Sequence, residues 1–166
     1  MGLLDWLKPK ASPQKLAAER LATRIFSAAQ IATVASLGAP CLQHPNFERI
    51  ANGIQDRFLL TLITSAVPLT MHRVSLQATP DSKEDVFGCL LSHLREFNNL
   101  APKLFIDCWE FLVKAKTDVS ESSADAGVWL IWNLKGARPT SDEFREGAMQ
   151  GIALGQFATQ WFDAGL

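Results

Sequence analysis

The cysteine and histidine residues are the chain's candidate metal ligands. Cys41 and His44 are separated by two residues in a proline-containing stretch, and Cys89 lies four residues before His93. A spacing of four puts Cys89 and His93 on one side of a helix, where a thiolate and an imidazole could occupy two vertices of a zinc tetrahedron. No Cys-x-x-Cys occurs, and nothing in the sequence brings the two pairs together. We predict no metal site, and expect Cys89 to be a small core residue and His93 to be hydrogen-bonded.

Side chains that could act in catalysis are few. Residues 12–15 match a Ser-x-x-Lys motif, but the Ser-Asp-Asn and Lys-Thr-Gly segments that accompany it in enzymes are missing. Asp107 and Glu110 are one helical turn apart, and Glu110 precedes Lys114 by four residues, an order that favours a surface ion pair. No glycine-rich phosphate loop follows a predicted strand. The sequence therefore favours a non-enzymatic function without a cofactor.

Three glycines, Gly147, Gly151 and Gly155, recur at intervals of four in a stretch that otherwise predicts a helix. Each glycine costs about 1 kcal/mol relative to alanine in a helix interior, so a close contact should offset the loss. The spacing lines them along one stripe, which another backbone or a flat group could approach closely. The occupant can be an alanine-rich or tryptophan-rich helix of the same chain, a second copy of the chain, or a ligand.

Tryptophan residues form the second unusual set. Trp109 lies on one predicted helix, while Trp129 and Trp132 share a face of another. Such rings usually belong to the core, because each buries a large apolar area. The alternative is an apolar pocket for a lipid, quinone or similar flat molecule, between the tryptophans and the glycine stripe. The candidate ligand- or partner-binding residues are therefore Gly147, Gly151, Gly155, Trp109, Trp129 and Trp132.

The elements that must position these residues are predicted to be helices. Ser12-Pro13 is typical of a helix start, and helical periodicity follows as far as the break at Gly38. A second helix is expected from near Asn46. We expect Pro68 to kink or end this helix, because proline lacks the backbone N–H that a helix needs, and a separate short turn to cover residues 69–77.

Further helices are expected over about residues 79–97, 102–116, 122–136 and 140–162. Ser122 with Asp125 resembles a capping box, and Thr140 with Glu143 matches one fully. The run 128–132 is apolar on every side of a helix. This pattern predicts that the helix bearing Trp129 and Trp132 is the central buried element of the bundle.

The chain is therefore expected to be all-α, a single globular bundle of about six helices. Its 166 residues, 48% of them apolar, suffice for one core, with residues 1–11 as an N-terminal apolar arm and residues 12–166 as one helical domain. A formal net charge of −1 argues against nucleic acid as a partner. The odd number of cysteines and the missing export signal indicate a cytoplasmic protein.

No transmembrane segment is predicted, because the apolar run from Phe58 to Met71 is shorter than the roughly 20 residues that a bilayer requires. The apolar side chains of the N-terminal arm would either fold back onto the core or touch a membrane peripherally. These side chains are Leu3, Leu4, Trp6 and Leu7.

Because no set of residues specifies a reaction, we expect a non-enzymatic helical interaction or scaffold protein. It would associate with a protein partner or with itself, as a homodimer or larger homo-oligomer. The alternative is a carrier or sensor of a small apolar ligand, bound between the tryptophan-bearing helices and the glycine-striped last helix.

Overall fold

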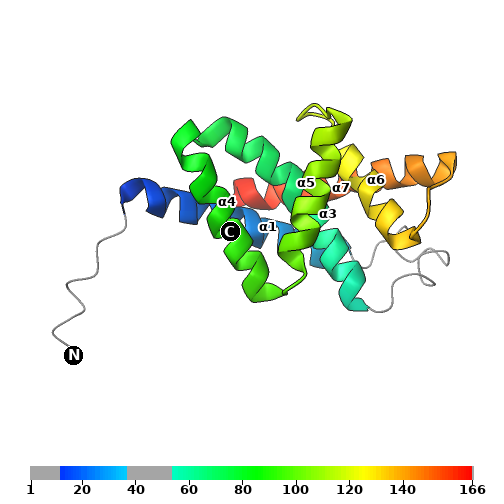
Figure 1. Ribbon diagram of the computed structural model, residues 1–166, viewed down its shortest axis with the longest axis horizontal. Helices are drawn as coiled ribbons and strands as arrows, with labels where there is room; N and C mark the ends of the chain where they lie inside the picture. The colour runs from blue at the N-terminus through cyan, green and yellow to red at the C-terminus, as the bar shows by residue number, and fades with distance from the viewer. Residues whose placement is uncertain (1–11, 37–53, 166) are drawn as a thin grey trace.

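The computed structural model describes residues 12–36 and 54–165, and every regular element in these ranges is an α-helix (Figure 1). The predicted all-α bundle is therefore confirmed. The helices are α1 (Pro13–Ser36), α3 (Ile54–Gln77), α4 (Pro80–Phe97), α5 (Ala101–Ala115), α6 (Ser122–Lys135) and α7 (Ser141–Ala164). Several predicted features lie outside the described residues, namely the N-terminal arm with Leu3, Leu4, Trp6 and Leu7, the residues Cys41 and His44, and the expected helix start near Asn46.

The prediction that a separate turn follows Pro68 is wrong, because α3 continues through Pro68 to Gln77. A proline inside a helix costs about 3 kcal/mol through the lost hydrogen bond and the clash with the preceding turn. Around Pro68 the helix is enclosed by neighbouring helices, and all side chains from Leu59 to Thr70 are buried. Tertiary packing therefore outweighs the local cost of the proline.

Helix α3, rather than α6, is the most enclosed element, because α1, α5, α6 and α7 all pack against it. In α6 the residues from Val128 to Ile131 are buried as predicted, but Trp132 is 42% exposed. The segment Arg57–Gln77 of α3 is long and apolar enough, by length and composition, to cross a membrane. Most of that segment is buried inside the protein, as is expected of a core helix.

Several buried hydroxyl groups on α3 are satisfied within the helix itself. The hydroxyls of Thr64, Ser65 and Thr70 donate to carbonyl oxygens one turn earlier, at 2.8, 3.1 and 2.6 Å. The hydroxyl of Thr61 is equally buried, but it has no hydrogen-bond partner in the described part of the chain. An unmade hydrogen bond of this kind lowers the stability of the fold.

The two predicted capping boxes have different outcomes. The box at the start of α7 is confirmed, since the Thr140 hydroxyl accepts from the Glu143 N–H and the Glu143 carboxylate accepts from the Thr140 N–H. The box at Ser122 and Asp125 does not form. Helix α6 takes Glu121 as its N-cap, so Ser122 lies inside the helix and its hydroxyl donates to the carbonyl of Val119.

Candidate functional site

The glycine stripe of α7 faces α6, and α6 fills it. A Cβ on Gly151 would lie 2.6 Å from the backbone nitrogen of Gly127, and a Cβ on Gly147 would lie 2.6 Å from Cγ1 of Ile131. At Gly155 the obstacle is the side chain of Ser123, because an added Cβ would meet its Oγ first and would lie 2.8 Å from its Cβ. Of the three occupants considered for this stripe, the structure places the tryptophan-bearing helix of the same chain there.

Gly127 on α6 is a packing residue that the sequence analysis missed. A Cβ at this position would lie 2.6 Å from the backbone nitrogen of Gly151 and 2.7 Å from its Cα. The available signal was a glycine in the middle of a predicted helix. As with the glycine stripe, its cost in helix propensity indicates a close contact that offsets it. The two backbones therefore approach each other directly, and atoms of α6 and α7 fill the space between these glycines.

The structure separates Trp109 from the other two candidate tryptophans. Trp109 packs edge-on against Phe87 of α4, with ring centroids 4.7 Å apart, and stacks with Phe105 at 6.1 Å. Trp129 is almost fully buried, whereas the ring of Trp132 meets Phe111 of α5 edge-on at 6.4 Å. Only Trp129 and Trp132 come together, and only Trp132 offers much surface to a partner.

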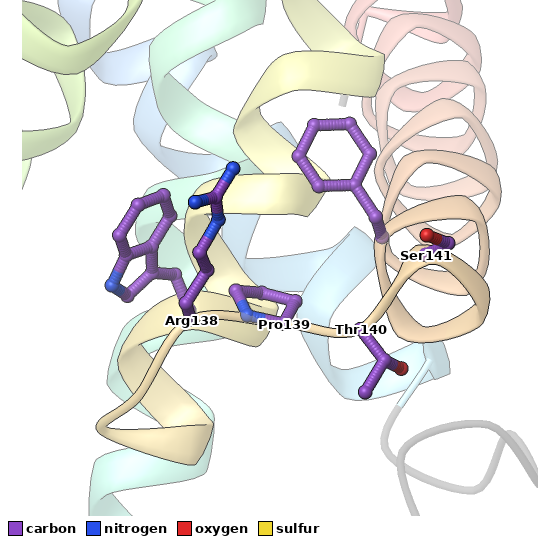
Figure 2. A pocket seen from close by; sticks show the side chains of 6 residues that line it. Arg138, Pro139, Thr140 and Ser141 are labelled. Carbon is purple, nitrogen blue, oxygen red and sulfur yellow. The ribbon is translucent and has the colours of Figure 1, made fainter.

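Two hollows meet at Trp132. The larger hollow, of about 790 Å³, lies where the loop after α6 enters α7 (Figure 2), and its walls are Trp132, Arg138, Pro139, Thr140, Ser141 and Phe144. The smaller, of about 380 Å³, lies between α5 and α6 and is lined by Asp107, Glu110, Phe111, Lys114, Trp129, Trp132 and Asn133. We call the surface formed by these two sets of residues the Trp132 face. Its apolar centre consists of Trp132 and the 48% exposed Phe144.

Four charged side chains on or beside the Trp132 face form two ion pairs within the chain. Glu110 accepts from Lys114 at 2.9 Å, which confirms the predicted surface ion pair. Lys135 pairs with Glu143, and this ion pair, together with the Thr140 N–H, lowers the pKa of the Glu143 carboxyl to about 2. The carboxylates of Glu110 and Glu143 therefore each have a lysine partner within the chain.

The candidate metal ligands Cys89 and His93 lie on α4 but are not arranged as a metal site. The Thr23 hydroxyl donates to the Glu19 carbonyl at 2.8 Å, so its oxygen accepts from Nε2–H of His93 at 3.1 Å. His93 is therefore hydrogen-bonded, as expected, and its ring also stacks on Phe26. Because Nε2 carries the proton of this hydrogen bond, it has no lone pair for a metal.

Cys89, the second candidate ligand on α4, has a thiol whose pKa is raised, first by burial and then by the carboxylates of Glu19 and Asp85. Among the described residues no group of three or more His, Cys, Asp and Glu side chains could hold a metal ion.

A second charged cluster, which the sequence analysis missed, lies at the end of α7. The guanidinium groups of Arg24 and Arg73 lie 4.3 and 4.4 Å from the ring centroid of Phe162. Arg24 also donates to the Phe162 carbonyl at 2.7 Å, and Arg73 pairs with Asp163 at 2.6 Å. Cations at a helix C-terminus stabilise its exposed carbonyls, so these arginines have a structural role. No local sequence signal links two arginines on separate helices.

Comparisons with known proteins supply no family for this chain. No protein-family model matches it, and no curated protein or solved structure matches it significantly. The residues of the Trp132 face, rather than those of a relative, are therefore the basis for a functional proposal.

Proposed function

We propose that the protein is a non-enzymatic interaction protein that self-associates through the Trp132 face. The observation that carries the proposal is the large exposed fraction of Trp132, 42%, between two hollows. Tryptophan is among the residues that contribute most to binding energy at protein interfaces, above all where it fits a pocket on the partner. Phe144 extends the apolar centre, and the polar residues around both hollows resemble the rim of an interface.

The chemistry of the Trp132 face suits binding better than catalysis. Its lining residues include neither histidine nor cysteine. Glu110 is held by Lys114, and Glu143, just beside the face, is held as a carboxylate by Lys135. A general acid or base needs a pKa near the working pH, whereas the ion pair with Lys135 and the Thr140 N–H lower the pKa of Glu143 to about 2.

The test is sedimentation equilibrium of the full chain over a range of concentrations. We expect the mass to rise from one protomer toward two, and Trp132→Ser to weaken the association at least about tenfold, since a central interface tryptophan contributes 2 kcal/mol or more. Far-UV circular dichroism should remain unchanged. The matched control is Met149→Ser on α7, because Met149 is even more exposed, at 65%, but lies outside the Trp132 face. A mass of one protomer at every concentration would overturn the proposal.

A small planar anion is a second candidate for the larger hollow. The volume of about 790 Å³ lies within the range of small-molecule sites, and Arg138 stands there beside two aromatic side chains. The probe is anilinonaphthalene sulfonate, which combines an aromatic body with an anionic group. Saturable one-to-one binding that Arg138→Gln abolishes would support this candidate, and the absence of saturable binding would remove it.

A further inference from the structure

Two exposed side chains of opposite charge remain unpaired on the Trp132 face. Arg138 lines the larger hollow, where Figure 2 shows its side chain extending from the loop before α7. Asp107 lines the smaller hollow, on α5. Neither has an ion-pair or hydrogen-bond partner within residues 12–36 and 54–165, although their neighbours Glu110 and Lys114 pair with each other.

The positions of these two charges are related by Trp132. Trp132 lines both hollows, whereas Arg138 lines only the larger and Asp107 only the smaller, so the two charged side chains belong to separate hollows that share Trp132 as a wall. A surface with a positive and a negative group flanking an apolar centre is complementary to a second copy that faces it. The half-turn that relates the two copies is about an axis that lies in the interface and passes through this centre, between the two charges. In a two-fold dimer every contact occurs twice, so one such pair of residues supplies two ion pairs.

We propose that a second copy of the chain docks on the Trp132 face about a two-fold axis beside Trp132, so that Arg138 of each copy pairs with Asp107 of the other. This inference rests on the self-association proposed above, and it names the partner's orientation. The two tryptophans meet near the axis and supply apolar contact, while the reciprocal ion pairs fix the register. Such pairs also suppress wrong partners, because like charges brought together at an interface are strongly unfavourable.

A second copy fits this surface better than an unrelated ligand does. A small anion would satisfy Arg138 and leave Asp107 unpaired, and a small cation would do the reverse. A partner that carries a negative and a positive group can satisfy both, and the chain itself carries such a pair on this face. The two-fold arrangement is also closed, so assembly stops at two copies rather than growing into a filament.

The experiment reverses one of the two charges in each of two variants. The variants Arg138→Glu and Asp107→Lys each place like charges at both contacts of their own dimer, so each should self-associate at least about tenfold more weakly than wild type. When the two variants are mixed, position 138 of one faces position 107 of the other with opposite charges at both contacts. The mixture should therefore form a heterodimer of near wild-type affinity. Native mass spectrometry resolves it directly, because the two variants differ in mass.

The control is Lys83→Glu, an exposed residue at the start of α4, which changes net charge as Arg138→Glu does without touching the face. It should leave dimerisation unchanged. If wild type dimerises through Trp132 but the mixed variants fail to recover affinity, the Arg138–Asp107 pairing is wrong and the proposed function stands. If wild type remains a monomer, both are wrong. Growth beyond two copies would overturn the two-fold geometry alone.

Discussion

The carbonyl oxygen of Gly147 on α7 occupies the space where a side chain on Gly127 of α6 would have to begin. Gly127 and Gly151 are related in the same way, since a Cβ on either would lie 2.6 Å from the backbone nitrogen of the other. Glycine at these positions lowers helix propensity, but it allows two backbones to pack with no side chain between them. The packing of α6 against α7 therefore depends on the glycines of both helices.

Gly127→Ala should lower the free energy of unfolding by about 3 kcal/mol or prevent folding, because the obstacles to its Cβ are backbone atoms that move only if the helices separate. The matched control is Gly88→Ala on α4, where an added Cβ meets nothing within 4 Å. That change should stabilise the protein by about 1 kcal/mol through helix propensity. Urea denaturation measures both, and equal effects at the two positions would contradict the packing described.

Local features of this fold are predictable from the sequence where a few neighbouring residues determine them. The capping box of Thr140 and Glu143 is such a case, because both partners lie within one turn. Pro68 is the opposite case. Its local effect favours a helix end, but the packing around α3 keeps the chain helical through Pro68. The spacing of the α7 glycines signals a close contact, yet their partner is set by how α6 lies in the bundle.

The candidate site was predicted only in part for the same reason. Trp129 and Trp132 share a helix and therefore lie together, but the face of α5 that reaches them carries Phe111 rather than Trp109. Arg138 and Asp107 belong to a loop and a helix far apart in the sequence, so no periodic pattern relates them. Only the folded arrangement of α5, α6 and the start of α7 brings them onto one surface.

Thr61→Val should raise the free energy of unfolding by about 1 kcal/mol. The substitution keeps the branched shape and removes a buried hydroxyl that has no hydrogen-bond partner in the described part of the chain. The control is Thr64→Val, three residues further along α3, where the hydroxyl donates to the Leu60 carbonyl at 2.8 Å. This second change should destabilise by about 1 kcal/mol or less. Chemical denaturation measures the free energy of unfolding of both variants. Stabilisation by both substitutions would show that the hydrogen bond at Thr64 contributes nothing.

The thiols of Cys89 and Cys108 should react in a fixed order with a thiol reagent. Burial raises the pKa of both, but Cys108 is completely buried, whereas Cys89 is half-buried on α4. Because the thiolate is the reactive form, Cys89 should label slowly and Cys108 only when the chain unfolds. A Cys41→Ser background removes the third thiol, and denaturant should expose both remaining ones. Rapid labelling of Cys108 in the folded protein would contradict its placement in the core.

Glu143→Gln should destabilise the protein near neutral pH and lose that effect in acid. The ion pair with Lys135 and the hydrogen bond from the Thr140 N–H lower the pKa of Glu143 from 4.5 to about 2. A carboxyl whose pKa is lower in the folded than in the unfolded chain stabilises the fold above its unfolded value. That contribution falls as the pH drops from about 4.5 toward 2.

Thermal unfolding at a series of pH values measures the difference between wild type and Glu143→Gln. We expect the melting temperature of wild type to be the higher one near neutral pH. The two curves should converge as the pH falls from 4.5 toward 2, because Glu143 is protonated first in the unfolded chain and only near pH 2 in the folded one. The control is Glu110→Gln, which breaks the exposed pair with Lys114 and should change stability by less than about 1 kcal/mol. A difference for Glu143→Gln that persists unchanged at pH 2 would mean that the carboxylate charge is not what holds Lys135 and the start of α7 together.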